Sequence, residues 1–155
     1  MDIGNLLADG GVVLRSGASS KRQALHTVAE AAAQSLGLPE TRIMDALLER
    51  EALGATGLGS GVAVPHARID GVDQVTALFV RLDTPVAYGA VDDQPVDLIF
   101  ALFAPPREGA DHLRALAAVS RALRSPEMRE RLRQAKTTDA IRALFVRDRA
   151  PATAA

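Results

Sequence analysis

PVDLIFALFAP, residues 95–105, is an almost unbroken apolar run. A strand covered on both faces shows such a run, whereas a strand with one solvated face alternates apolar and polar residues. Another apolar segment rich in β-branched residues, QVTALFVRLD at 74–83, precedes it, and TPVAYGAVDDQ at 84–94 is expected to connect the two irregularly. The sequence therefore predicts two strands, the later one central in a sheet.

Helical patterns flank these strands on both sides in the sequence. A helix is expected over 21–37, capped by Ser19 or Ser20 and with Gly37 as the C′ residue. Another is expected over 39–53, opened by Pro39 and ended by Gly54. Three more helices are expected after the strands, over 112–124, 126–135 and 137–145. Strands and helices in this arrangement predict an α/β fold with a mixed sheet flanked by helices.

The two ends of the chain carry weaker signals. A short helical turn is expected at Ile3–Ala8, then a turn at Asp9-Gly10-Gly11 and a short strand at Val12–Leu14. Residues 147–155 are polar and small, and we expect a disordered tail there. No linker divides the rest, so residues 1–146 are predicted to form a single domain.

Composition excludes several classes of function. The chain has 155 residues, 48% of them apolar, and a net charge of −1, so no excess positive charge indicates a nucleic-acid partner. The absence of cysteine excludes disulfides and cysteine–zinc sites, and fits a reducing compartment. The sequence has neither a signal-peptide pattern nor the roughly 18–20 apolar residues that span a bilayer. We expect a cytoplasmic protein without membrane insertion.

The stretch GLGSGVAVPHARID, residues 57–70, is the first candidate site. Gly57, Gly59 and Gly61 follow a helix and precede a strand, the reverse of a dinucleotide-binding loop, and no P-loop lysine is present. Glycines do allow backbone N–H groups to approach an anion, and His66 at the end of the loop is a competent nucleophile for a phosphoryl group. The alternative is that the glycines only form a tight turn and His66 is a surface residue.

Two further residues are candidates near such a site. His112 is expected at the first position of its helix, after the cap Asp111, where the helix N-terminus attracts anions. Arg50 lies at the edge of the apolar stripe of its helix, and its guanidinium suits phosphate oxygens. Each has a plainer interpretation, His112 as a solvated first-turn residue and Arg50 as a last-turn partner of the helix dipole. His26, in mid-helix, is predicted to be structural or solvated.

Several segments together resemble a known family. GLGSGVAVPHA, preceded by LLEREALGATG, resembles the phosphorylation-site signature of the fructose/mannitol-type enzyme IIA domains of the bacterial phosphotransferase system. The similarity extends to KRQAL, LDTPVAYGAVDDQPVDLIFALFAP and HLRALAAVSRAL, in that order along the chain. It is strongest to the nitrogen-regulatory enzyme IIA and reaches to about Phe145, and it implies the fold of type 2 IIA domains.

The resemblance implies roles for individual residues. His66 takes the position of the histidine that is phosphorylated on Nε2, with Arg50 sixteen residues before it and His112 forty-six after it as active-site partners. Thr56 and the glycines correspond to the loop around the phosphate. The chain departs from the family pattern at three places: Ala55 replaces a hydroxyl residue, Ala67-Arg68 replaces Gly-Lys, and Gly89 replaces an acid.

The resemblance also implies a function. His66 would accept a phosphoryl group from an HPr-like carrier with no nucleotide, metal or other cofactor, and partner proteins would be regulated by its phosphorylation state. Delivery of the phosphate to a sugar-specific enzyme IIB is the close alternative. A metallohydrolase using His66, His112 and an acid is disfavoured, because no paired ligand motif is present. A pure interaction domain with a vestigial site would bind partners regardless of phosphorylation.

Overall fold

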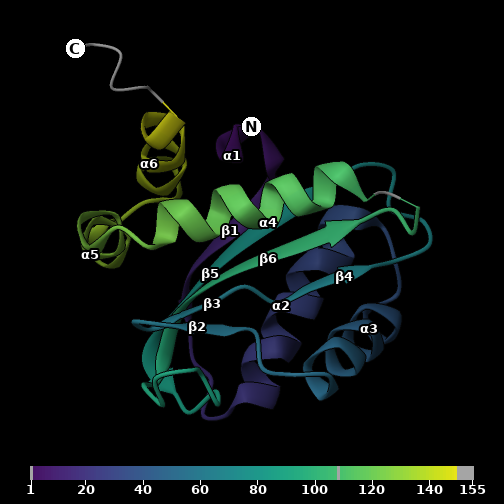
Figure 1. Ribbon diagram of the computed structural model, residues 1–155, viewed down its shortest axis with the longest axis horizontal. Coiled ribbons are helices and arrows are strands. Elements are labelled where there is room, and N and C mark those ends of the chain that lie inside the picture. The colour runs from purple at the N-terminus through teal and green to yellow at the C-terminus, as the bar shows by residue number, and fades with distance from the viewer. Residues whose placement is uncertain (1, 108, 150–155) are drawn as a thin grey trace.

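The centre of the sheet is β6 (Val96–Ala104), the strand that the apolar run predicts. The computed structural model describes residues 2–107 and 109–149, with side chains described as far as residue 146. β5 (Thr76–Val86) pairs antiparallel with one edge of β6, and β3 (Val62–Ala63) and β4 (His66–Arg68) pair in parallel with the other edge (Figure 1). The sheet is therefore mixed, as predicted.

The two outer strands complete the sheet. β1 (Leu7–Ser16) runs parallel to β5, and β2 (Gly57–Gly59) pairs antiparallel with β3, which gives the strand order β1-β5-β6-β3-β2. The expected Asp9-Gly10-Gly11 turn is wrong, because these residues lie inside β1. The pairing register with β5 shifts between Leu7 and Val12, and Gly10 has φ 71°, so a bulge accommodates the glycines within one strand.

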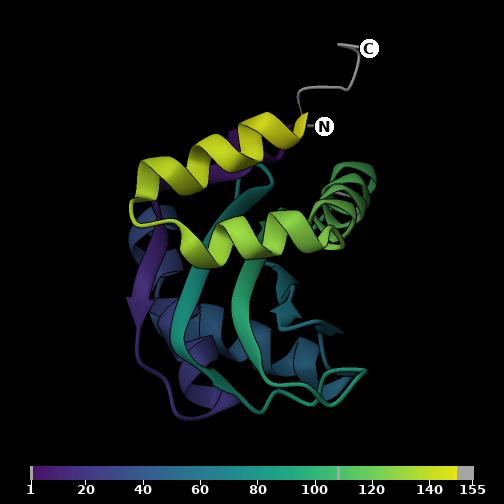
Figure 2. The same ribbon diagram turned by 90° about the vertical axis from the view of Figure 1, so that its left-hand side faces the viewer.

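Helices cover both faces of the sheet (Figures 1 and 2). α2 (Lys21–Leu36) and α3 (Glu40–Ala52) pack on one face. The helices on the other face are α1 (Ile3–Leu6), α4 (Ala110–Leu123), α5 (Pro126–Gln134) and α6 (Thr138–Arg149). Start and stop signals act as predicted at α2, where Ser20 Oγ accepts from the N–H of Gln23 and Gly37 adopts the left-handed conformation.

Alternate residues of β6 enter two separate cores. The side chains of Leu98, Phe100 and Leu102 pack with α4, α5 and α6, whereas those of Ile99, Ala101 and Phe103 pack with α2 and α3. All six are fully buried. Burial of each large apolar side chain contributes about 1.5–3 kcal/mol, so this strand holds both helical layers to the sheet. The expectation of a strand covered on both faces is confirmed.

Several boundaries differ from those expected. The N-terminal helical turn ends at Leu6, and the strand expected at Val12–Leu14 spans Leu7–Ser16. The connection over 84–94 begins later than predicted, because β5 continues to Val86, which pairs with Val96. α6 ends at Arg149 and so includes residues 147–149 of the expected tail, while residues 150–155 lie outside the described residues. β4 lies beside α3 and begins with His66. This places the candidate histidine at the surface between α3 and α4.

Candidate functional site

His66 and His112 lie in one open cleft between α3 and α4. The cleft has a volume of about 460 Å³. Its lining combines the two histidines and two arginines with apolar side chains: Ala46, Glu49, Arg50, Leu53, His66, Ala67, Arg68, His112, Leu113 and Leu116. All three residues singled out from the sequence, His66, Arg50 and His112, therefore meet in this cleft.

The hydrogen bonds of His66 define its tautomer. Its Nδ1 lies 2.9 Å from the carbonyl oxygen of Val64, across Pro65. A carbonyl oxygen only accepts, so Nδ1 must carry the proton and donate it. Nε2 then holds the ring's lone pair, which makes Nε2 the nucleophilic atom of the ring.

Arg50 is held against that nitrogen. It lies in the last turn of α3, and its Nε donates to Nε2 of His66 over 3.2 Å. A second donor of the same guanidinium, Nη1, bonds the carbonyl oxygen of Gly54 at 2.9 Å. These two bonds orient the guanidinium beside the nucleophilic nitrogen, where a fork of N–H donors can bind the oxygens of an anion.

Burial shifts the acid–base behaviour of His66. The ring is half-buried, and desolvation lowers its pKa below the ordinary 6.5. The charge of Arg50 also lowers the pKa, and together these effects outweigh the bond to the Val64 carbonyl, which raises it. His66 is therefore predominantly neutral at neutral pH, the form with an available lone pair.

His112 lies beside His66 but is not solvated. The two ring centroids are 5.5 Å apart, with the rings inclined at 55°. Only 3% of His112 is exposed. The expectation that Asp111 caps this helix is wrong, because the N-cap is Gly109 and Asp111 pairs with Arg114 instead. His112 is consequently the third residue of α4, within the first turn, where the helix dipole favours an anion.

The glycines of the candidate loop form a hairpin, not a lining of the cleft. β2 and β3 are joined at Ser60 and Gly61, whose φ angles of 57° and 82° are both positive, as in the type I′ turns of tight hairpins. A Cβ at Gly57 would lie 2.8 Å from Cβ of Ala90, and one at Gly61 would lie 2.9 Å from Oδ1 of Asp97. Turn geometry and close packing account for these glycines.

The remaining glycine, Gly59, and Thr56 do not line the cleft either. A Cβ at Gly59 would meet the carboxylate of Asp92 at 3.2 Å. Thr56 is buried, and its hydroxyl bonds Glu51 and lies 3.2 Å from the hydroxyl of Tyr88. The assignment of Thr56, Gly57, Gly59 and Gly61 to a phosphate-binding loop thus finds no support in the cleft's lining, and the tight-turn alternative explains the glycines.

The buried carboxylate of Glu51 is a feature that sequence reasoning missed. Its neighbours are Lys21, Thr56 and Tyr88, which come from three other segments of the chain. The only signal in the sequence is that Glu51 lies about as near the apolar stripe of its helix as Arg50 does. Helical periodicity alone does not show that this carboxylate is enclosed.

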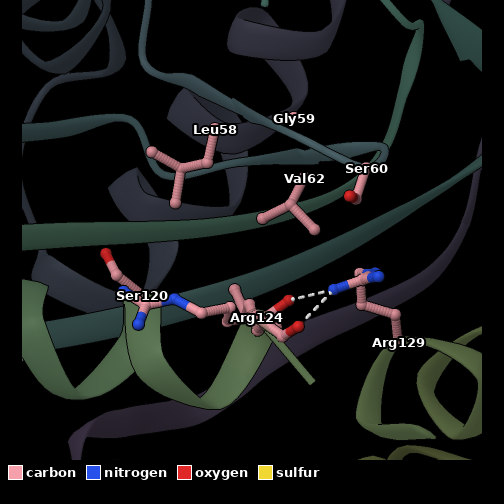
Figure 3. Close-up of a pocket in the computed structure, with 8 residues that line it drawn as sticks. Leu58, Gly59, Ser60, Val62, Ser120, Arg124 and Arg129 are labelled. Atoms are coloured by element: carbon pink, nitrogen blue, oxygen red, sulfur yellow. Dashed lines mark hydrogen bonds between the residues drawn. The ribbon is translucent and has the colours of Figure 1, made fainter. Parts of the chain in front are cut away.

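A second cavity, of about 320 Å³, lies between the hairpin and the end of α4, with Ser60, Val62 and Ser120 on its walls (Figure 3). Arg129 donates its Nη1 to the carbonyl oxygens of Leu123, at 3.0 Å, and Arg124, at 2.7 Å. This arginine therefore binds the free carbonyls at the C-terminus of α4. No histidine is among the residues that line this cavity, and the hydrogen bonds of Arg129 serve the end of α4.

The described residues contain neither a metal-binding cluster nor a membrane-spanning helix. Within residues 2–107 and 109–149, no group of three or more histidine, aspartate or glutamate side chains is placed to hold a metal ion. No helix in the same part of the chain is long and apolar enough to cross a membrane.

Fold and cleft together define an α/β protein with an open cleft lined by two histidines and two arginines. Residues 5–147 match the family described as "Phosphoenolpyruvate-dependent sugar phosphotransferase system, EIIA 2", and the chain belongs to this family. It is 41% identical over 155 residues, the full length of both chains, to the nitrogen regulatory protein of Bradyrhizobium diazoefficiens. The resemblance noted in the sequence is thereby confirmed, and the chain has a general role in phosphoryl transfer.

Solved structures agree with this assignment. The crystal structure of nitrogen regulatory protein IIA-Ntr from Neisseria meningitidis superposes with a TM-score of 0.87, at 34% identity, covering 92% of this chain and 98% of that one. The mannitol enzyme IIA of Escherichia coli, solved in complex with phosphorylated enzyme IIB, shares the fold with a TM-score of 0.76, at 24% identity, over 90% of this chain and 98% of its own. The type 2 IIA fold is confirmed.

Proposed function

We propose that His66 accepts a phosphoryl group on Nε2 from the phosphohistidine of an HPr-like carrier. The observation that carries the proposal is the placement of this nitrogen in an open cleft beside the Arg50 guanidinium. The ring proton is on Nδ1, so Nε2 carries none. A neutral imidazole with its lone pair facing a cation is ready both to attack phosphorus and to hold the phosphoryl oxygens afterwards.

The transfer exchanges one P–N bond for another. The lone pair of His66 Nε2 forms a bond to phosphorus while the donor's P–N bond breaks, and its electron pair returns to the donor imidazole. Positive charge develops on the His66 ring, and the Val64 carbonyl that accepts from Nδ1 stabilises it. Arg50 then donates to the phosphoryl oxygens, with His112 and the first turn of α4 on the other side.

The rim of the cleft supports a protein as donor. Leu53 is 82% exposed and Leu113 is 62% exposed, and both line the cleft beside the histidines. Exposed apolar side chains grouped at a site are typical of surfaces that bind another protein. A carrier protein that seats its own phosphohistidine on this rim would cover both leucines.

We further propose that the phosphorylation state controls which protein partners bind. The full-length similarity to a nitrogen regulatory protein supports this role. Transfer onward to a sugar-specific enzyme IIB is a second candidate, because the mannitol enzyme IIA of the same fold was solved with a phosphorylated IIB.

Reconstitution tests the proposed reaction. The chain is incubated with phosphoenolpyruvate, enzyme I and an HPr-type carrier, and its intact mass is measured before and after mild acid treatment. We expect a gain of one phosphate that acid removes. Absence of uptake, or an acid-stable phosphate, would contradict the proposal. A second incubation with a sugar-specific enzyme IIB then separates the two roles, since loss of phosphate to IIB supports sugar delivery.

A further inference from the structure

Glu51, next to Arg50 in the last turn of α3, has a buried carboxylate with partners on both oxygens. Its side chain is 6% exposed, and Oε2 lies 2.7 Å from Nζ of Lys21. The backbone N–H of Thr56 donates to the same oxygen over 3.2 Å. The other oxygen, Oε1, accepts from the Thr56 hydroxyl and, over 3.2 Å, from the hydroxyl of Tyr88. A buried carboxylate is stable only with partners of this number and kind.

These partners join four segments that are distant in sequence. Lys21 is the first residue of α2, Glu51 lies in the last turn of α3, and Thr56 immediately precedes β2. Tyr88 follows β5, and Nζ of Lys21 lies 4.5 Å from the centroid of its ring. Burial raises the pKa of Tyr88, so its hydroxyl stays protonated and donates to Glu51. One carboxylate therefore fixes the end of α3 relative to the rest of the molecule.

A short chain of bonds leads from Glu51 to the nucleophile. The hydrogen bonds between Thr56 and Glu51 hold the two ends of segment 52–55 together, and this segment contains Gly54. The Gly54 carbonyl accepts from Nη1 of Arg50 at 2.9 Å, and Nε of the same guanidinium donates to Nε2 of His66 at 3.2 Å. We propose that Glu51 is a positioning residue that holds the Arg50 guanidinium against His66. Its effect on rate rests on the proposed function.

A double-mutant cycle separates this role from a general structural one. Glu51→Gln places an amide against Lys21, and we expect phosphoryl transfer to slow by about tenfold to a hundredfold through kcat, with the donor's KM nearly unchanged. In an Arg50→Ala background, the same substitution should cause no further slowing. If the two losses multiply, Glu51 does not act through Arg50, and the proposal is overturned. Glu127→Gln, which removes a surface ion pair with Arg131, is the matched control.

A second readout requires no phosphorylation, so it stands even if the proposed reaction fails. In the native protein, we expect the Nε–H of Arg50 to give a slowly exchanging NMR resonance, because it is bonded to His66. In Glu51→Gln that proton should exchange as fast as in a solvated arginine. If the resonance is unaffected, the proposal is wrong. Should Glu51→Gln fail to fold, Thr56→Val is measured in the same way; it removes the hydroxyl's contacts with Glu51 and Tyr88 and keeps the backbone bond to Glu51.

Discussion

The Nε–H of Arg50 points at the lone pair of His66 Nε2 across 3.2 Å. In the proposed reaction this same nitrogen attacks phosphorus, so the bond must give way as the phosphoryl group arrives. The guanidinium then stands next to the new P–N bond with its donors free for the phosphoryl oxygens. One arginine can thus orient the nucleophile before transfer and stabilise the phosphate after it.

Replacement of Arg50 by lysine tests the need for a planar fork. We expect Arg50→Lys to slow transfer by about tenfold to a hundredfold, because a charge-assisted hydrogen bond contributes about 1.5–3 kcal/mol and a point ammonium cannot make the paired contacts. Initial rates of phosphate uptake measure the change. Arg42→Lys is the control on the same helix, since Nη1 of Arg42 donates to the exposed carbonyl oxygen of Asp70. Equal rates for the native protein and Arg50→Lys would mean that Arg50 only interacts with the dipole at the end of its helix.

His112 is expected to assist transfer without carrying the phosphate. A helix-end interaction contributes about 0.3–1 kcal/mol, or roughly 2 kcal/mol when partly buried, which corresponds to at most one to two decades in rate. We therefore expect His112→Gln to acquire one phosphate on His66 at a reduced rate. Because His112 is buried, the free energy of unfolding is measured alongside, so that uptake is compared per folded molecule. Complete loss of phosphate uptake by a folded variant would contradict this prediction, because it exceeds a rate loss of one to two decades.

The lowered pKa of His66 predicts a pH dependence with a definite sign. Desolvation, assisted by Arg50, keeps the folded ring neutral below the pH at which an unfolded histidine takes up a proton, about 6.5. Between that pH and the lower folded pKa, the unfolded chain binds the extra proton, so the contribution of His66 to stability falls as pH falls. An NMR titration of the His66 ring should give a midpoint below 6.5. A midpoint above it would mean that the bond to Val64 dominates.

Substitution of the hairpin glycine Gly61 is expected to lower stability without slowing phosphoryl transfer. Its φ of 82° disfavours any other residue, and an added Cβ would meet Asp97 and the guanidinium of Arg133. Gly61→Ala should reduce the free energy of unfolding by about 1–3 kcal/mol. Gly17→Ala, where a Cβ meets open space, is the control. Uptake per folded molecule should be unchanged, and a slowed rate would restore the phosphate-loop hypothesis for this residue.

Local patterns predict much of this fold because its elements have strong signals. The apolar run at 95–105 identifies β6, since a strand with two covered faces is apolar at nearly every step. Ser20 and Gly37 mark the ends of α2 through hydrogen bonds that lie within one turn. The bulge in β1 could not be found in this way, because Asp9-Gly10-Gly11 has the composition of a turn and only the pairing with β5 keeps it extended.

The site was predictable where its residues follow a fixed pattern and not where long-range packing decides. The spacing of Arg50, His66 and His112 comes from the family resemblance, and the cleft brings all three together. The burial of His112 follows from where α4 starts, one residue before Asp111, which has the chemistry of a cap but does not act as one. The enclosure of Glu51 depends on partners up to 37 residues away, which no helical periodicity reveals.

The most direct test locates the phosphate itself. Wild-type protein phosphorylated through enzyme I and an HPr-type carrier is digested under mild conditions and mapped by mass spectrometry, with His66→Ala and His26→Ala beside it. We predict one phosphate on His66, its attachment to Nε2 visible as coupling between phosphorus and that ring nitrogen by NMR. His66→Ala should fold and take up none, whereas His26→Ala, altered on the exposed face of α2, should match wild type. A phosphate on His112, or normal uptake by His66→Ala, would contradict the assignment of His66 as the carrier.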